Sequence, residues 1–409
     1  MEPSDRFLTG VVASDGVWPV APTLMSYSSL MEIEECPRRW MLSRATYPDL
    51  WNHPGYPATP SVPALVGQVI HKSLELIIDS FATRGCIGPN TECATLALRT
   101  LGGYTAVISQ IAAAIHDRLR EQPNGDVYSE KLREALFAEL PDIRQRVQSL
   151  VARSELVPRP QTAANLHAVA RQRVPLGPGS HAEVDLLSPL IAWTGRADLI
   201  NIGPSVIEIV DYKTGYRHHS HADQLRTYAL LWFRDPELNP SERLATRLVL
   251  RYPDEDAEVD FPTKAQLLDL EMELAARTQS ARAELAKRPP SAKPSEENCS
   301  GCPVRQLCAE YWSHLAGRQK QPLDPDGALF GDVELRIEQR SGARSWLAKV
   351  IRSDKLADNS NVLLRTVAEI VSFREGQRIR MLNAAIGGGE PTRVAIAQTS
   401  NSEVFQGTA

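Results

Sequence analysis

The spacing of hydrophobic residues changes from a helical period to a strand-like period near the middle of the chain. Between residues 64 and 83, apolar side chains recur every three or four positions, as on one buried face of an α-helix. The same period predicts helices over 104–121, 129–154 and 161–173. We therefore expect the first part of the chain to be rich in helix.

Short apolar runs separated by turn residues follow this helical part. They predict three strands, and then a helix, a strand and a long amphipathic helix. In chain order these elements span 183–187, 193–200, 206–212, 221–232, 245–252 and 264–287. The expected fold class is therefore α/β, with a small sheet and a helical insertion at about residues 84–180.

A stretch rich in Pro, Gly and Asp at 320–327 is the expected linker to a second unit. Beyond it, five short strand-like runs are separated by turn signals. They lie at 333–339, 345–351, 362–367, 377–382 and 393–398. Five strands in so short a segment favour a small closed barrel, with the OB-fold ahead of an SH3-like barrel. The expected division is an N-terminal extension (1–22), a first domain (23–319) and a C-terminal barrel (328–409).

The composition is that of an ordinary globular protein. Of the 409 residues, 43% are hydrophobic and 23% are charged, and the formal net charge is −5. No apolar run is long enough to span a bilayer, and the N-terminal residues lack the pattern of a signal peptide. We therefore expect a cytoplasmic protein without a membrane function. The net charge argues against non-specific coating of nucleic acid but leaves room for a basic groove.

Two carboxylates and a lysine lie where the predicted strands should be apolar. Asp198 lies within the run GRADLI, and Asp211 and Lys213 end the next strand in VIEIVDYKTG. Carboxylates on adjacent strands can converge on a hard cation such as Mg²⁺. Because side chains alternate along a strand, Asp211 and Lys213 point to the same face, where the lysine can orient a nucleophile and stabilise charge on a phosphate. The competing interpretation is an ordinary salt bridge between these two residues.

Other polar residues accompany this set. His71 lies on the first predicted helix in a G-x3-H-x3-E pattern, and imidazole is a common metal ligand. Gln224 and Tyr228 lie one helical turn apart and face the same way. Glu75, which ends the His71 pattern, fits either a second metal or a salt bridge. By strand alternation Glu208 points away from Asp211, so we interpret it as structural.

The spacing of the six cysteines separates them into two groups. Cys299, Cys302 and Cys308 form C-x2-C-x5-C, and Cys36 is the upstream candidate for a fourth thiolate. Zinc and iron–sulfur clusters both accept four cysteines, but zinc sites usually contain two C-x2-C pairs and only one is present here. The isolated Cys86 and Cys93 are expected to be reduced and buried as small apolar side chains.

Taken in order, these patterns resemble the PD-(D/E)XK nucleases, specifically the RecB-like branch that includes AddB and the CRISPR-associated RecB-like exonucleases. The similarity covers about residues 26–312 and rests on SYSSL…CPRR, GxxxH, GRAD, DYKTG, QxxxY and the trailing cysteines. It implies a restriction-endonuclease-like core. It also implies that Asp198, Asp211 and His71 bind Mg²⁺ or Mn²⁺, that Lys213 is the catalytic lysine, and that Gln224 and Tyr228 contact DNA.

The same resemblance implies a role for the four cysteines. Cys36, Cys299, Cys302 and Cys308 would hold a [4Fe–4S] cluster as a structural staple that joins the two ends of the nuclease domain. Closing so long a loop restricts the unfolded chain. Zinc, or free cysteines with no common ligand, are the alternatives.

The implied function is a metal-dependent deoxyribonuclease, acting as an exonuclease on single-stranded or frayed DNA ends in repair, recombination or antiphage and CRISPR-type defence. The sequence contains no G-x4-G-K-[ST] motif, so we expect no nucleotide cofactor, and any helicase or defence-complex subunit would be a separate partner. The alternative is a non-catalytic DNA-binding or assembly subunit of a helicase–nuclease or defence complex.

Further DNA contacts are expected outside this motif set. Arg196, beside Gly195, is predicted to contact phosphate, although an ion pair is equally consistent with its position. In the barrel, Trp346, Arg344 and Arg378 are predicted to grip single-stranded DNA by stacking and by phosphate contacts. The competing interpretation places the aromatic residues in the barrel core and leaves the arginines as a solvated face.

Overall fold

The structure is a computed structural model of the whole chain. It describes residues 18–48, 52–57, 60–121, 125–159, 173–318, 329–367, 373–388, 394–399 and 402–406. The predicted linker at 320–327 and most of the predicted N-terminal extension lie outside these ranges, as does the predicted helix at 161–173 apart from Arg173.

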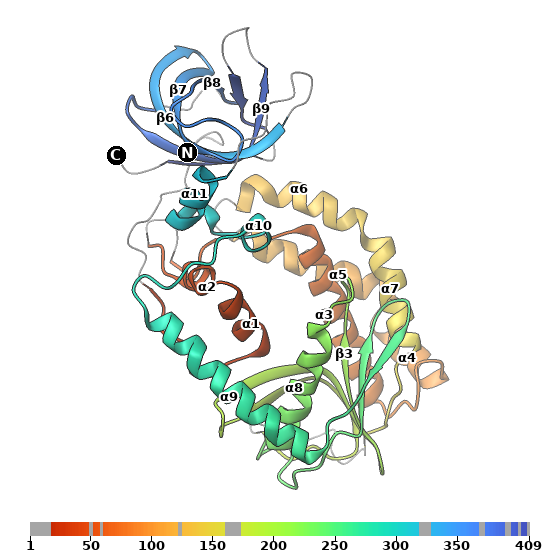
Figure 1. Cartoon of the computed structure of the whole chain (residues 1–409). Coiled ribbons are helices and arrows are strands. Elements are labelled where there is room, and N and C mark those ends of the chain that lie inside the picture. Colours follow the sequence, from red (N-terminus) through yellow and green to blue (C-terminus); the bar gives the residue numbers. More distant parts are fainter. Residues whose placement is uncertain are drawn as a thin grey trace.

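A mixed five-stranded sheet forms the centre of the first unit (Figure 1). Its strands, in spatial order, are β1 (Gly179–Ser188), β2 (Trp193–Ile202), β3 (Ile207–Tyr212), β4 (Arg247–Arg251) and β5 (Asp256–Val259). Only β3 and β4 pair in parallel, and the helix α8 (Ser220–Arg234) connects them. Every residue of β3 is buried, the acidic Glu208 and Asp211 included, so this strand is covered on both faces.

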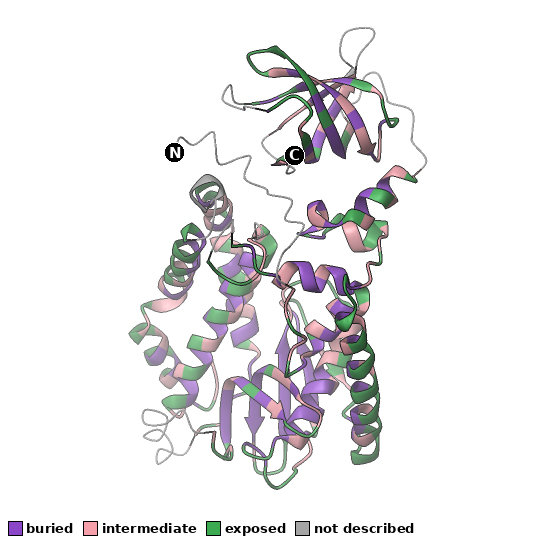
Figure 2. Ribbon diagram, turned by 90° about the vertical axis from the view of Figure 1, so that its left-hand side faces the viewer, coloured by how far each residue is buried: buried purple, intermediate pink, exposed green. Residues whose placement is uncertain are grey.

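Helices cover both faces of this sheet, and each face contributes to its own hydrophobic core. Ile200 and Ile209 pack in one core with residues of α1 (Tyr27–Glu35), α8 and α9 (Lys264–Ala286). Their neighbours Leu199 and Val210 pack in the other core with α3 (Val62–Thr83), α5 (Gly103–Arg120) and α7 (Leu140–Ala152). Successive side chains on a strand point to opposite faces, so one sheet serves both cores. Figure 2 shows these strands coloured as buried.

The helical insertion differs from its prediction in two places. The helix predicted over 129–154 is divided into α6 (Gly125–Ala138) and α7, because Pro141 in the first turn of α7 has no backbone N–H to continue an earlier helix. The insertion also contains α4 (Glu92–Thr100), which the apolar spacing did not indicate.

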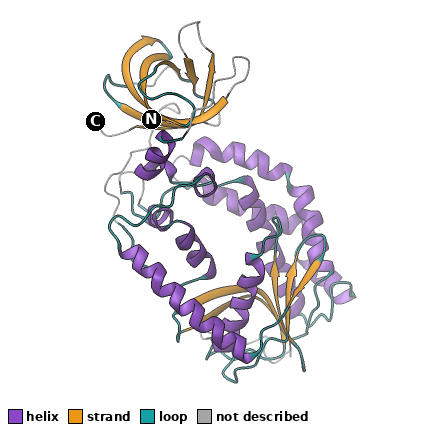
Figure 3. Ribbon diagram, in the orientation of Figure 1, coloured by secondary structure: helices purple, strands orange, loops and turns teal. Residues whose placement is uncertain are grey.

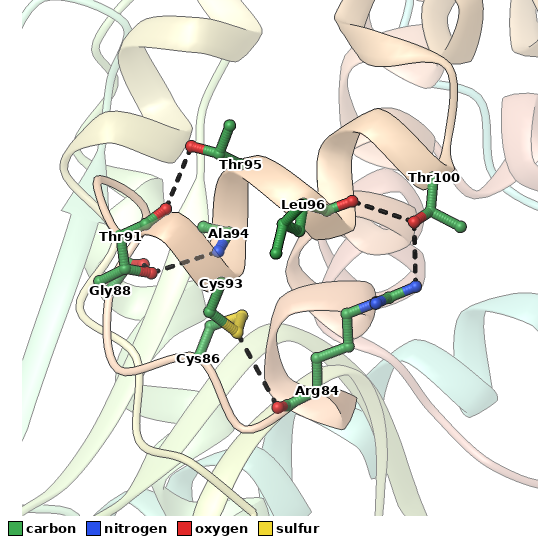
Figure 4. Close-up of a disulfide and its surroundings, with 9 residues drawn as sticks. All are labelled: Arg84, Cys86, Gly88, Thr91, Cys93, Ala94, Thr95, Leu96 and Thr100. Carbon is green, nitrogen blue, oxygen red and sulfur yellow. Dashed lines mark hydrogen bonds between the residues drawn. A yellow bond between two sulfur atoms is a disulfide. The ribbon is translucent and has the colours of Figure 1, made fainter.

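Cys86 and Cys93 form a disulfide, so the prediction that they are separate, reduced side chains is wrong (Figure 4). Cys86 follows the end of α3, and Cys93 lies in the first turn of α4. Gly85, with φ of 74°, reverses the chain after α3, and Thr91 caps α4 by accepting a hydrogen bond from the Ala94 amide. The two Cα atoms are thereby brought to 5.5 Å, within the range that a disulfide spans.

The C-terminal unit is built of strands (Figure 3). They are β6 (Leu329–Gly342), β7 (Ser345–Ser353), β8 (Asn361–Arg365), β9 (Arg378–Gly388), β10 (Val394–Ala397) and β11 (Glu403–Gln406). Pairing runs from β6 through β7, β8, β10 and β9 back to β6, with β8 and β10 parallel. The additional strand β11 pairs with β9 and was not predicted. Val333, Leu335 and Ile337 point into the core that these strands enclose.

Short helices connect the two units. They are α10 (Glu296–Ser300), the 3₁₀ turn η3 (Arg305–Leu307) and α11 (Ala309–Ala316), which follow α9, whereas α2 (Pro37–Arg44) packs against α1 and α9 within the first unit. Figure 1 shows α11 between the first unit and the strands of the second. Among the described helices, none combines the length and the apolar character that crossing a membrane would need.

Candidate functional site

The two predicted carboxylates lie opposite each other on neighbouring strands. The antiparallel register that pairs Leu199 with Val210 brings Asp198 of β2 level with Asp211 of β3. Both are buried, with 9% and 3% of their surface exposed. Buried carboxylates need compensating partners, so the groups around them define what the site can do.

Asp198 is held by one backbone amide and one imidazole. Its Oδ2 accepts a hydrogen bond of 2.6 Å from the Tyr212 amide, and its Oδ1 lies 3.2 Å from Nδ1 of His71 on α3. A Cβ placed on Gly67 would lie 3.3 Å from Oγ1 of Thr214, so the glycine of the G-x3-H pattern lets α3 approach the end of β3. The approach brings His71 to the carboxylates although these residues are far apart in sequence.

Lys213 connects Asp211 to the helix α8. Its Nζ lies 2.6 Å from Oδ2 of Asp211 and donates a hydrogen bond of 2.7 Å to Oε1 of Gln224. The Gln224 amide donates in turn to the Tyr228 hydroxyl at 2.7 Å. The structure therefore joins the lysine to both residues of the Q-x3-Y pattern in one hydrogen-bonded series.

The charges of the site shift the pKa values of its members. Burial and the neighbouring Asp198 raise the pKa of Asp211 to about 7, although Lys213 opposes the shift. Burial alone would lower the pKa of His71, but its hydrogen bond to Asp198 and the nearby carboxylates raise it above the usual value. A cluster of buried carboxylates that repel one another is an environment in which a cation is stabilising.

Glu183 is a member of this site that the sequence did not reveal. Ligand atoms of His71, Glu183 and Asp198 all lie within 4.8 Å of one another, close enough to hold one metal ion. The β1–β2 register places Glu183 opposite Asp198, and Glu183 has a φ of 49°, in the left-handed region that is rare for this residue type. Glu183 is the first residue of a predicted strand that also has acidic residues on its solvent-exposed face. Its position in the sequence therefore did not indicate a metal ligand.

The remaining polar candidates have protein partners. Glu75 pairs with Lys72 at 2.6 Å, and Glu208 accepts from the Asn201 amide at 2.7 Å and pairs with Arg247. Arg196 donates two hydrogen bonds to Asp185, of 2.6 and 3.1 Å, and lies 3.6 Å from Glu183. For Glu208 the structure shows a buried ion pair away from the site, and for Arg196 an ion pair at its edge.

The four cysteines Cys36, Cys299, Cys302 and Cys308 are free thiols and line one pocket. Arg38 joins the remote cysteine to the others, because its guanidinium donates two hydrogen bonds, of 2.8 and 2.9 Å, to Glu310, two residues after Cys308. The Arg38 Nε also donates to the Pro290 carbonyl at 2.8 Å. The two ends of the first unit therefore lie side by side at this pocket.

The chemistry of the pocket fits a thiophilic metal centre. Burial raises the pKa of Cys302 to about 11, against the lowering effect of Arg39, and raises the pKa of Cys308 to about 12. Buried thiols of this kind stay protonated unless a bound metal displaces the protons. Positive side chains that balance thiolate charge also line the pocket, namely Arg38, Arg39, Lys293 and Arg305.

The aromatic residue predicted to stack on DNA is largely buried. Trp346 is 5% exposed, and its ring packs edge-on against Phe373 with centroids 5.4 Å apart. This conformation offers no open ring face for a base. Arg378 is exposed and pairs with Glu334 at 2.9 Å, and Arg344 is exposed in the turn between β6 and β7. The arginines lie on the surface of the unit, whereas the tryptophan lies in its core.

A family comparison matches residues 24–309 to the PD-(D/E)XK nuclease superfamily. The match spans most of the chain and includes every motif described above, so the chain belongs to this superfamily. Its members are nucleases that use divalent metals, and the His71, Glu183 and Asp198 group supplies nitrogen and oxygen ligands of the required kind. None of the curated proteins matches the chain.

The solved structures that resemble the chain have low sequence identity to it and low TM-scores. A murine DNA-binding protein bound to double-stranded DNA is 8% identical with a TM-score of 0.17, and the alignment covers 56% of this chain and 95% of that one. The crystal structure of SSO0001 is 18% identical with a TM-score of 0.21, covering 47% and 81%. The p204 HINb domain is 9% identical with a TM-score of 0.18, covering 57% and 99%.

Proposed function

We propose that this chain is a metal-dependent deoxyribonuclease whose active site contains His71, Glu183, Asp198, Asp211 and Lys213. The observation that carries the proposal is the convergence of two opposed buried carboxylates, an imidazole and a lysine at the meeting of α3, β2 and β3. A structural salt bridge would account for Asp211 and Lys213, but it would not require His71 and Glu183 to face Asp198 as well.

Each side chain has a definite part in phosphodiester hydrolysis. His71, Asp198 and Asp211, with Glu183 as an additional ligand, would hold Mg²⁺ or Mn²⁺, which polarises the phosphate and promotes ionisation of the attacking water. The Tyr212 amide fixes the orientation of Asp198. The Lys213 ammonium, placed between Asp211 and Gln224, orients the nucleophile and stabilises the negative charge that develops on the phosphate.

Gln224 is proposed to position the DNA strand, and Tyr228, which is 7% exposed, to hold the Gln224 side chain in place. The Tyr228 ring lies against Gly195, where a Cβ would approach its Cε1 atom to 2.9 Å. Gln224 is hydrogen-bonded to both Lys213 and the Tyr228 hydroxyl. A DNA strand bound by α8 would therefore be aligned with the lysine. The exonuclease action on single-stranded or frayed DNA ends is proposed from the resemblance of the sequence motifs to the RecB-like branch.

The four cysteines are proposed to hold a [4Fe–4S] cluster. Support comes from their common pocket, the basic side chains around it and the single C-x2-C pair, whereas a zinc site usually contains two such pairs. Quantification of iron, sulfide and zinc in purified protein tests the assignment. Stoichiometric zinc without sulfide would identify the metal as zinc and leave the nuclease proposal unaffected.

The C-terminal unit is proposed to be an OB-type barrel that engages single-stranded DNA. The ring of strand pairings with parallel β8 and β10 supports the barrel, and the exposed Arg344 and Arg378 support phosphate contacts. Since Trp346 is buried, binding through these arginines would depend on salt more than on base stacking.

A cleavage assay tests the proposed activity. End-labelled single-stranded and double-stranded DNA is incubated with the full chain and Mg²⁺ or Mn²⁺, beside Asp211→Ala and a matched control, Glu258→Gln, which changes an exposed carboxylate of the same sheet. We expect cleavage by the wild type and the control, and none by Asp211→Ala or after chelation. Metal-dependent DNA binding without cleavage would instead support the non-catalytic subunit.

A further inference from the structure

The C-terminal unit packs against the loop that contains three of the four cysteines. Asp332 of β6 is buried, and its Oδ2 accepts hydrogen bonds from Arg305 at 2.8 Å and from the Tyr311 hydroxyl at 2.6 Å. Its Oδ1 accepts a hydrogen bond of 2.9 Å from the Asn383 amide of β9. One carboxylate therefore joins two strands of the C-terminal unit to two residues of the cysteine loop.

Further contacts surround this carboxylate. Arg380 of β9 donates a hydrogen bond to the carbonyl of Gln306, and its guanidinium lies 5.2 Å from the centre of the Trp312 ring. On the apolar side, Leu382 and Phe405 belong to the same buried cluster as Cys302, Cys308 and Trp312. The contact is thus a packed interface with polar pairs, in which two cysteines take part directly.

We propose that residues 299–312, here called the cysteine loop, form the docking surface for the C-terminal unit, and that docking and metal binding by the four cysteines stabilise each other. The proposal rests on the proposed metal centre, but neither on the identity of the metal nor on nuclease activity. Its partner is the face of the C-terminal unit of this same chain that is formed by β6, β7, β9 and β11.

The shortness of the loop's elements is the physical reason for the coupling. The helix α10 has five residues and η3 has three, too few to be stable without tertiary support. Arg305 and Gln306, which contact the C-terminal unit, lie between Cys302 and Cys308, and Arg305 also donates to the Cys302 carbonyl at 3.3 Å. A metal that fixes both cysteines therefore fixes the two docking residues between them.

Thermodynamic linkage makes the coupling testable from the side of the C-terminal unit. If metal binding favours docking, docking must favour metal retention by the same factor. Asp332→Asn removes the charge that Arg305 and Tyr311 contact while keeping the side-chain shape. Glu338→Gln is the matched control, since Glu338 is an exposed carboxylate on the same strand, and its ion pair among the described residues is with Arg336 of that strand.

The experiment measures the affinity of the full-length protein for its metal, by equilibrium competition with a chromophoric chelator. We expect Asp332→Asn to bind the metal about 5-fold or more weakly than the wild type, and Glu338→Gln to match the wild type. Equal affinities in all three proteins would overturn the proposal. Zinc in place of iron would change only the metal that is measured, and a protein without nuclease activity can be tested in the same way.

Amide hydrogen exchange of the wild type provides the reciprocal measurement and does not depend on the folding of a variant. After metal removal we expect faster exchange at Asn383 and at residues 379–382, while the core strand β8 remains protected. Unchanged protection of Asn383 in protein that has lost its metal would contradict the coupling.

Discussion

His71 Nδ1 lies 3.2 Å from Asp198 Oδ1, a contact between a helix in the first part of the chain and a strand in the middle of the central sheet. The contact fixes the imidazole at the edge of a carboxylate group that includes Asp211 and Glu183. It also brings an imidazole nitrogen and a carboxylate oxygen to one place, where both would serve as ligands of one metal ion instead of contacting each other.

Asp211→Asn should reduce DNA cleavage by about 100-fold or more, because even residues that only support a metal ligand contribute ~10–100-fold to activity. The measurement is the initial rate on end-labelled DNA with Mg²⁺ at saturation. Unchanged far-ultraviolet circular dichroism would show that the variant folds. A rate close to that of the wild type would remove Asp211 from the site.

Glu183→Gln should weaken Mn²⁺ binding by about 10-fold, if Glu183 supplies an oxygen ligand beside His71 and Asp198. Calorimetric titration of Mn²⁺ into the full chain measures this affinity without reference to activity. The control is Glu75→Gln, whose side chain pairs with Lys72. Wild-type affinity in Glu183→Gln would assign this carboxylate a structural role.

The metal-free protein should become less stable as pH rises from about 4 to about 7. The pKa of Asp211 is raised to about 7 in the folded state by burial and by Asp198, so the folded protein holds a proton that the unfolded chain has released. Asn at position 211 cannot ionise, and Lys213 retains its hydrogen bond to Gln224. We therefore expect Asp211→Asn to melt about 2 °C or more above the wild type at pH 8 in chelator.

The same comparison provides two internal controls. The difference in melting temperature should shrink as pH falls from about 7 towards 4, where Asp211 is protonated in the folded wild type as well. With saturating Mg²⁺ the order should reverse, because the ion stabilises only the protein that keeps its ligand. A variant that is less stable than the metal-free wild type at every pH would show that Asp211 stabilises the fold through Lys213.

Cys86→Ser should destabilise the oxidised protein by about 2–3 kcal/mol, the chain-entropy value for a short disulfide-closed loop. Urea unfolding with and without reductant measures the effect, and reduced wild type should unfold like the variant. Cys36→Ser should instead lose the bound metal, both with and without reductant. Metal loss in Cys86→Ser would contradict the separation of the two cysteine groups.

The sequence by itself determined four strands of the central sheet, although not β5, and every proposed metal ligand except Glu183. The strand β3 and the polar residues at its end could be recognised from the sequence. A strand covered on both faces is mostly apolar, and Asp211 and Lys213 depart from that pattern. Alternation also placed Glu208 away from Asp211, where it pairs with Arg247. These are local properties, which depend only on neighbouring residues.

Only the tertiary structure decided which distant residues meet. Glu183 joins His71 because the β1–β2 register and the packing of α3 bring them together, and neither is written in local spacing. Trp346 looked the same in sequence as an exposed stacking residue, but the closure of the strands turned its ring into the core. The Cys86–Cys93 disulfide and the contact of Asp332 with Arg305 likewise depend on how the chain turns back on itself. Periodicity reports which face a residue occupies, whereas the packing of separate elements decides what that face meets.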